Sequence, residues 1–480
     1  MSSTITIPIW FFTLLAVVFV YVSVNKFIWP SLKWFFRKKV NTAINELNKR
    51  LNIRLKPFQL TKRQVLLERL VYDQKLLDYV QQLSIEDEVP HEILMERVNQ
   101  YAREIVPSFN AYLYYRFGFW LSKKLAKLLY RVRVGTENDE KFEDLNKDAT
   151  IVFVMNHRSN MDYILVSFLV AEKTTLSYAV GEWAQIWPLR SLIRSMGAYF
   201  VRRNSRNPLY RKVLERYISM ATREGVSQAV FPEGGLTRDG KIRPPKLGFL
   251  DYMLRDFDHK QDKDILFIPV GINYDRVLED RTLLRSLDPD AETKSRWYAI
   301  KTTLKFWVHN MRLAYRHQWK RFGYASVRFS QPVSAREYCR KNRVNFSSLD
   351  KEKRFEKVEK LADELMHKIE RTIPVVPVVL LASVFVKQPK RGIAKSTVIK
   401  NARKLMEQIE KQGGHILFPH KDKQINLDAG LEMLKLRRLI EDDGKTCRIT
   451  SDSLVVLQYY AHSIDCWLSE TNSKNKAVKA

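Results

Sequence analysis

The spacing of apolar residues changes character twice along the chain. Residues 40–134 repeat apolar positions every three or four residues, as in RQVLLERLVYDQKLLDYVQQL, which is typical of amphipathic helices. Residues 135–340 contain short β-branched runs separated by segments long enough for crossover helices. Residues 341–480 return to helical spacing and end in a polar tail. The pattern predicts a helical subdomain, an α/β domain with a mixed, largely parallel sheet covered by helices, and a C-terminal helical region.

Five apolar runs in the α/β region predict strands. They are IVFVM at 151–155, AYFV at 198–201, QAVF at 228–231, ILFIPVGI at 265–272 and ASVRF at 325–329. In open α/β sheets, ligands bind beyond the carboxyl ends of the strands. We therefore expect the functional side chains directly after these runs.

The amino-terminal segment, residues 1–39, predicts a membrane anchor. Residues 5–24 are uncharged and almost wholly apolar, and a helix of about 20 residues crosses a hydrocarbon core about 30 Å thick. The positions that follow are basic, with Lys26, Lys33 and Arg37 among them, so the positive-inside rule places the remainder in the cytoplasm. A buried core helix is the alternative interpretation.

Two further segments combine apolar and basic character. Residues 112–134, YLYYRFGFWLSKKLAKLLYRVRV, interleave aromatic residues with Lys and Arg, which suits a helix packed on the core or one lying in a lipid interface. Residues 374–386 are apolar but short and carry two prolines. They predict the start of a buried helix rather than a second membrane span.

Composition narrows the range of partners. The formal net charge is +29, so the surface attracts anions such as phosphorylated metabolites, acidic carrier proteins and anionic lipid headgroups. No zinc-finger spacing or RNA-recognition signature is present, and nucleic acid is not an expected partner. The three cysteines are too few and too scattered for a disulfide framework. The nine histidines are dispersed, so we expect no metal site.

The first strand ends in MNHRSNMD, residues 155–162, which places His157 and Asp162 five positions apart. A histidine can take a proton from an alcohol near neutral pH, and a carboxylate on its other ring nitrogen stabilises the imidazolium that forms. If a helix begins near Asn160, Asp162 can face back toward the imidazole. By itself the pair is more typical of a turn histidine beside a capping aspartate.

The next two strand ends carry cations and a glycine turn. Arg202 and Arg203 follow the second strand and form a clamp for a phosphate, or else a pair of solvated surface arginines. The third strand runs into FPEGGLTRDGKIRPPKLG, residues 231–248, where glycines permit a close backbone approach to a ligand. An ordinary loop explains the glycines but not the carboxylate at the turn.

In this order, the four segments resemble the blocks of the glycerolipid acyltransferases. The blocks are His-x4-Asp at 157–162, Gly-x-x-Phe-x-x-Arg at 197–203, Phe-x-Glu-Gly at 231–234 and apolar-Pro-apolar at 268–270. HRSNMDY, GAYFVRR and FPEGG are most similar to the membrane-bound bacterial glycerol-3-phosphate O-acyltransferases and their mitochondrial relatives. The likeness runs from about residue 60 to about residue 464, most of the chain.

The resemblance implies a function and a set of site residues. It implies transfer of a fatty acyl group from coenzyme A or acyl carrier protein to the 1-hydroxyl of sn-glycerol 3-phosphate, at the bacterial inner membrane and without a further cofactor. His157 and Asp162 are then the catalytic residues. The implied substrate-binding residues are Arg158, Ser159, Arg202, Arg203, Glu233, Gly234, Arg238 and Lys246.

One position departs from the family pattern. Where the family usually has an arginine shortly after the Glu-Gly pair, this chain has Leu236. Either the phosphate site depends more on Arg202, Arg203, Arg238 and Lys246, or the acceptor differs. Dihydroxyacetone phosphate and lysophosphatidate are the alternative acceptors. A non-catalytic scaffold whose basic face binds anionic lipid or an acidic partner is the alternative from another class of protein.

Overall fold

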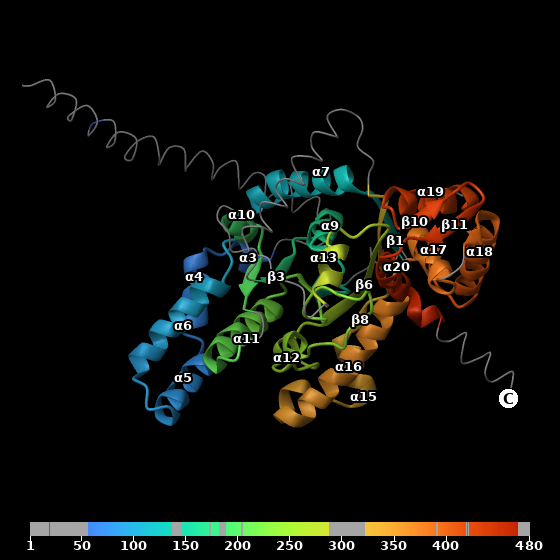
Figure 1. Cartoon of the computed structure of the whole chain (residues 1–480). Coiled ribbons are helices and arrows are strands. Elements are labelled where there is room, and N and C mark those ends of the chain that lie inside the picture. The colour runs from blue at the N-terminus through green and yellow to red at the C-terminus, as the bar shows by residue number, and fades with distance from the viewer. Residues whose placement is uncertain are drawn as a thin grey trace, which may run out of the picture.

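The computed structural model describes residue 19 and residues 56–468, apart from 137–145, 147, 172–173, 182–188, 203–204, 288–321, 390–391, 419 and 421. In this part of the chain, an α/β domain lies between an N-terminal group of helices and a C-terminal region (Figure 1). The central sheet has eight strands, which confirms the predicted α/β class.

The central sheet is mixed and mostly parallel, as predicted. The path of hydrogen-bonded neighbours is β1-β7-β6-β2-β5-β3-β4, and β8 pairs with β6. Strands β6, β2, β5, β3 and β4 run parallel to one another, whereas β7 is antiparallel to β6. The strands are β1 (Arg131–Thr136), β2 (Thr150–Met155), β3 (Ser177–Gly181), β4 (Tyr199–Val201), β5 (Gln228–Val230), β6 (Ile265–Tyr274), β7 (Tyr324–Phe329) and β8 (Val333–Ser334).

The five predicted strands all form, but three strands of the sheet were missed: β1, β3 and the two-residue β8. Strand β1 uses RVRV, which we expected at the end of the helical stretch 112–134, and it pairs in parallel with β7. The alternation of Arg and Val is a strand pattern, but the longer helical period before it obscures it. Strand β3, with the sequence SYAVG, is too short and too weakly apolar to stand out.

Alternate residues of the central strands face two separate cores, as the two-residue period of a strand requires. Ile151, Phe153 and Met155 pack in one cluster, and Val152 and Val154 pack in the other. The first cluster continues into α7, α9 and the C-terminal helices, and the second into α11, α12 and α16. These helices are α7 (Phe119–Leu129), α9 (Met161–Val170), α11 (Pro208–Arg223), α12 (Gly248–Leu254) and α16 (Lys351–Thr372).

The N-terminal group of helices packs against α11 and the edge strand β4. It comprises α3 (Pro57–Leu60), α4 (Arg63–Val71), α5 (Gln74–Glu86) and α6 (His91–Ile105). A π-helical turn, η2 (Leu113–Gly118), then leads into α7. Three shorter helices are α10 (Leu189–Ser195) between β3 and β4, α13 (Asp280–Arg285) between β6 and β7, and α15 (Ala335–Asn342) after β8.

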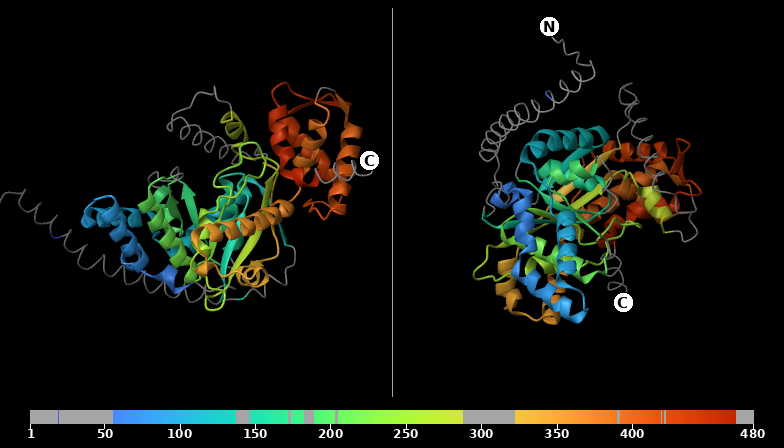
Figure 2. Two further views of the ribbon diagram at one scale, coloured as in Figure 1. Left: turned by 90° about the horizontal axis from the view of Figure 1, so that it is seen from below. Right: turned by 90° about the vertical axis from the view of Figure 1, so that its left-hand side faces the viewer.

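The C-terminal region is not purely helical, which corrects the expectation for residues 341–480. A three-stranded antiparallel sheet of order β10-β11-β9 lies among its helices. The elements after α16 are α17 (Pro377–Val386), β9 (Ile393–Ala394), α18 (Lys395–Lys411), α19 (Lys423–Leu436), β10 (Ile440–Asp442), β11 (Thr446–Ile449), α20 (Leu454–Ala461) and η5 (His462–Ile464). The apolar stretch 374–386 does form a buried helix, α17, at the centre of this lobe (Figure 2).

The predicted membrane anchor at 5–24 lies outside the described residues, except for Phe19. Within the described residues, no helix combines the length and the apolar character needed to cross a bilayer.

Candidate active site

The loop that carries His157 is fixed at the end of β2. The side chain of Asn156 continues the ladder between β2 and β6, since it donates to the carbonyl of Ile272 at 2.9 Å and accepts from the Ile272 N–H at 2.8 Å. Helix α9 then begins at Met161. Its first turn places Asp162 beside the loop, as the sequence predicted.

His157 and Asp162 form the expected pair. The Nδ1 of His157 lies 2.9 Å from Oδ2 of Asp162, and both side chains are buried. The same oxygen accepts the backbone N–H groups of Arg158 at 2.7 Å and Ser159 at 3.0 Å. The second oxygen, Oδ1, accepts the hydroxyl of Tyr274 at 2.5 Å. Burial and the charge of Asp162 keep the pKa of Tyr274 well above its usual value, so this hydroxyl remains a donor.

The imidazole of His157 is held on its faces by aromatic rings. Phe231 stacks on it with ring centroids 4.0 Å apart, and Tyr163 meets it edge-on at 5.3 Å. The Nε2 atom is buried and has no hydrogen-bond partner among the described residues. The arrangement leaves this one nitrogen able to accept a proton from a bound group.

Glu233 braces the histidine loop from the opposite side. Its two carboxylate oxygens accept the backbone N–H groups of His157 at 2.9 Å and Arg243 at 3.2 Å. The resemblance implies that this carboxylate binds substrate, and in the structure both of its oxygens contact the main chain. Burial raises the pKa of Glu233 to about 7.

Ser159 and Arg158 are also engaged by the protein. Ser159 donates to Glu279 at 2.7 Å, and Asn160 donates to the same carboxylate from its backbone and its side chain. The Arg158 guanidinium is buried, lies over the ring of Tyr459 and donates to the carbonyls of Gly240 and Tyr459. Both residues shape the loop, and their predicted contact with substrate stays a prediction.

The glycine turn after β5 borders a pocket of about 570 Å³. It is lined by Glu233, Gly234, Leu236, Arg238, Arg243 and Lys246, together with Leu283 of α13 and Ser286 just after that helix. Gly234 has a φ of +69°, and a Cβ there would lie 2.5 Å from Cδ of Lys246. The positive φ favours glycine at this position, and a side chain there would displace the Lys246 side chain. The structure brings four of the predicted residues, Glu233, Gly234, Arg238 and Lys246, into one cavity.

The structure does not bring Arg202 to this pocket. Strand β4 is separated from β2 by β5 and β3, a distance of roughly 14 Å at the usual strand spacing. The Arg202 guanidinium forms a paired contact with Glu104 of α6, at 2.6 and 3.0 Å, and lies over the rings of Tyr101 and Tyr210. Arg203 lies outside the described residues.

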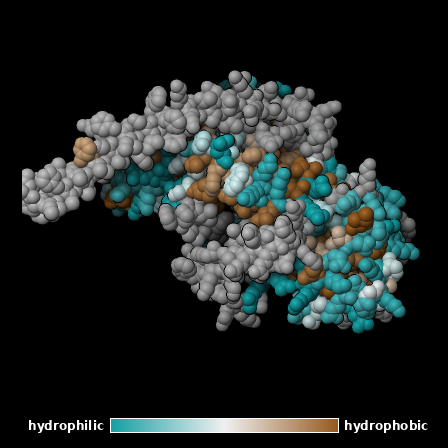
Figure 3. Space-filling model, turned by 90° about the horizontal axis from the view of Figure 1, so that it is seen from above, coloured by the Kyte–Doolittle hydropathy of each residue, from teal (hydrophilic) through white to brown (hydrophobic). Residues whose placement is uncertain are grey.

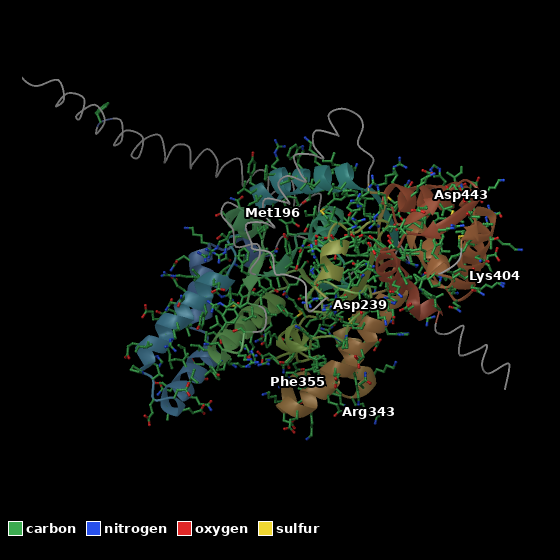
Figure 4. The ribbon with its side chains drawn as sticks, viewed as in Figure 1. Met196, Asp239, Arg343, Phe355, Lys404 and Asp443 are labelled. Carbon is green, nitrogen blue, oxygen red and sulfur yellow. The ribbon has the colours of Figure 1, made fainter. Side chains whose placement is uncertain are left out.

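The C-terminal region contributes to the same loops. Tyr460 and Arg437 both contact Asp280, next to Glu279, and the Tyr460 hydroxyl also accepts the N–H of Val277. His462 contacts the carbonyl of Asp239, which Figure 4 labels in the loop after β5. The loops beyond β5 and β6 thus take their shape partly from residues near the end of the chain.

Sequence reasoning missed four residues of this site: Asn156, Arg243, Tyr274 and Glu279. Tyr274 and Glu279 stand in INYDRVLED, directly after the fourth strand run. This polar segment at a strand end is the signal that identifies them. Asn156 directly follows the first strand run, and Arg243 lies in the segment 231–248 after the third. Their sequence neighbours are also polar, so nothing distinguishes these two residues from them. In the part of the chain that is described, no cluster of His, Cys, Asp and Glu side chains has the grouping of a metal site.

The family assignment agrees with this geometry. Residues 134–273 match the acyltransferase family model, and residues 311–464 match the model of the glycerol-3-phosphate acyltransferase C-terminal region. The chain thus carries an acyltransferase domain, followed by a region similar to the C-terminal region of the glycerol-3-phosphate acyltransferases. The first match covers the histidine loop and the glycine turn, and the second covers most of the C-terminal region, which contacts them.

Similar proteins from several bacteria are named glycerol-3-phosphate acyltransferase. A protein named glycerol-3-phosphate acyltransferase from Aeromonas hydrophila is 26% identical over 412 residues, which are 82% of this chain and 49% of the relative. One of that name from Haemophilus influenzae is 24% identical over 426 residues, 85% of this chain and 50% of the relative. The chain thus spans about half the length of these relatives. A solved 1-acyl-sn-glycerophosphate acyltransferase from Thermotoga maritima matches at 17% identity with a TM-score of 0.31, over 64% of this chain and 98% of that one.

We expect a Glu233→Gln substitution to change how stability depends on pH. The unfolded carboxyl titrates near its ordinary value of 4.5 and the folded one near about 7. Between these values the folded state holds a proton that the unfolded state has released, so rising pH favours unfolding. The wild type should therefore lose stability relative to the variant from about pH 4.5 to about pH 7, and the difference should level off above that.

Urea unfolding followed by tryptophan fluorescence at a series of pH values measures this difference. Glu407→Gln, which removes an exposed carboxylate on α18, is the control and should follow the wild type. A difference between wild type and Glu233→Gln that is independent of pH contradicts the expectation.

Proposed function

We propose that this protein transfers a fatty acyl group from an acyl thioester of coenzyme A or acyl carrier protein to the 1-hydroxyl of sn-glycerol 3-phosphate. The product is lysophosphatidic acid, the first intermediate of phospholipid synthesis. The observation that carries the proposal is the buried His157–Asp162 pair with a free Nε2, beside a pocket lined by cations. The two family models and the names of the relatives support the same reaction.

In the proposed reaction, His157 acts as general base. Its Nε2 removes the proton of the acceptor hydroxyl as the oxygen attacks the thioester carbonyl. The tetrahedral intermediate then collapses, the C–S bond breaks, and the thiolate of the carrier leaves and takes up the proton. Asp162 holds the hydrogen on Nδ1, so that Nε2 carries the lone pair, and stabilises the imidazolium. A general base of this kind contributes about 10²- to 10⁴-fold to the rate.

The acceptor phosphate requires cationic groups. Arg238 and Lys246 line the pocket next to the histidine loop and suit this role. The predicted contribution of Arg202 and Arg203 needs a movement of Arg202 away from Glu104, to which it is bound in this structure. Because Leu236 replaces an arginine that the family usually has, dihydroxyacetone phosphate and lysophosphatidate are the alternative acceptors.

Replacing His157 with Ala should abolish most of the activity. The loss should reach about 10²- to 10⁴-fold in kcat, since only the general base is removed. Formation of labelled lysophosphatidate by purified membranes measures it, with glycerol 3-phosphate, dihydroxyacetone phosphate and lysophosphatidate offered in parallel. His367→Ala, at an exposed histidine of α16, is the matched control.

Full activity of the His157→Ala variant would exclude the proposed mechanism. Salt-sensitive lipid binding that survives loss of His157 and Asp162, without acyl transfer by the wild type to any of the three acceptors, would favour the scaffold instead.

Replacing Tyr274 with Phe should lower kcat with little change in either KM. The substitution removes the hydroxyl that binds Oδ1 of Asp162, and a hydrogen bond to a charged group is worth about 1.5–3 kcal/mol. We expect a decrease of about ten- to a hundredfold in kcat, since each 1.4 kcal/mol is tenfold. Tyr72→Phe, at an exposed tyrosine, is the control. If the variant loses kcat because it unfolds, its melting temperature should also be lower than that of the wild type. An unchanged kcat would show that Tyr274 does not position the His157–Asp162 pair.

We further propose that the protein is anchored in the bacterial inner membrane by one span within residues 5–24, with its catalytic domain in the cytoplasm and in contact with anionic lipid headgroups. The apolar run and the basic residues after it support the span. Leu113, Phe117 and Trp120 are exposed along η2 and α7, and Lys124 lies over the Trp120 ring. Hydrophobic residues also gather on the face seen from above in Figure 3, the side on which α7 lies in Figure 1.

Deletion of residues 1–39 should release the protein from carbonate-washed membranes. The full chain should resist this extraction, because a span buries about 20 apolar residues in hydrocarbon. Restoring an unrelated apolar span in place of 5–24 should restore the resistance. Retention of the deleted form in carbonate-washed membranes would show that the anchor lies elsewhere.

A further inference from the structure

Arg243 lies in the cationic pocket, although neither the motifs nor their spacing point to it. Its side chain lines the cavity with Arg238, Lys246 and Leu236. We propose that Arg243 is a phosphate-binding residue for the acceptor and that it supplies, from the opposite end of the loop, the cation that Leu236 does not provide. This inference rests on the proposed function and assigns the phosphate subsite of the same site.

The side chain of Glu233 links the backbone of Arg243 to the backbone of His157. Glu233 accepts the N–H of His157 with one carboxylate oxygen and the N–H of Arg243 with the other. A single buried side chain therefore sets the distance between the proposed base and the arginine. A phosphate in this pocket would hold its glycerol hydroxyl within reach of the histidine loop, which is what an acceptor site requires.

The cations of the pocket are available for a ligand. Arg238, Arg243 and Lys246 form no ion pair with any described carboxylate. Glu233, which also lines the pocket, accepts two backbone N–H groups, and the charge of Arg243 acts on it without an ion pair. By contrast, Arg202 is already paired with Glu104, and Arg158 is buried against Tyr459. Unpaired guanidinium groups in a cavity are well suited to bind a phosphate through two parallel hydrogen bonds.

Leu236 makes the assignment specific to this chain. It lines the same cavity as Arg243, so a guanidinium from either position would enter the same space. Arg243 gives the pocket the one positive charge that an arginine at 236 would have supplied. The site therefore does not need a different acceptor.

The test compares charge removal with charge relocation in the purified full-length protein. Arg243→Gln should raise KM for glycerol 3-phosphate and Ki for inorganic phosphate by about ten- to a hundredfold, because one charge-assisted contact is lost. The KM for the acyl donor should not change. The double variant Leu236→Arg with Arg243→Leu should recover most of the acceptor affinity. Lys241→Gln, two residues away and outside the pocket lining, is the matched control for net charge.

Direct binding separates failure of this inference from failure of the proposed function. Calorimetry with inorganic phosphate and glycerol 3-phosphate, without an acyl donor, should show binding to the wild type and weakened binding to Arg243→Gln whether or not acyl transfer occurs. Leu236→Glu provides a second variant that leaves Arg243 in place and should weaken binding by repulsion. Unchanged phosphate affinity in Arg243→Gln overturns the inference, as does an increase confined to the KM of the acyl donor, which would assign the pocket to phosphates of the donor.

Discussion

The site depends on one buried carboxylate. Asp162 accepts the ring N–H of His157, two backbone N–H groups and the hydroxyl of Tyr274. A negative charge removed from water is costly unless it is surrounded by donors, and here the donors come from the histidine loop and from β6. The same contacts that compensate the charge also fix the orientation of the imidazole. The geometry of the site is therefore a consequence of satisfying this group.

Two further carboxylates accept hydrogen bonds from the histidine loop and connect it to neighbouring loops. Glu233 binds the main chain on one side, and Glu279 binds Ser159 and Asn160 on the other. Burial raises the pKa of both groups. Carboxylates that hold backbone N–H groups act as rigid spacers between neighbouring loops. In this protein the spacers determine the distance from the histidine to the cationic pocket.

Much of the fold could be predicted from the sequence, because parallel strands buried on both faces read as apolar runs. The His157–Asp162 contact was also predictable, since it lies within one strand–loop–helix connection. The spatial order of the strands in the sheet could not be predicted from the sequence. The Arg202 motif follows the second predicted strand in sequence, yet β4 lies at the edge of the sheet, three positions from β2. Likewise, no local pattern marks Arg243 as the neighbour of Glu233, because only the folded turn after β5 brings their atoms together.

The close approach of Gly240 to Tyr459 bears on how the protein is made. A Cβ at Gly240 would lie 1.9 Å from the Tyr459 carbonyl oxygen, and Arg158 donates to the carbonyls of both residues. The histidine loop is thus completed by a segment some 300 residues further along the chain. Because a chain is synthesised from its N-terminus and domains fold as they emerge, this loop reaches its final shape only after the segment around Tyr459 has left the ribosome. Until then, Arg158 in the histidine loop lacks its hydrogen bond to the carbonyl of Tyr459.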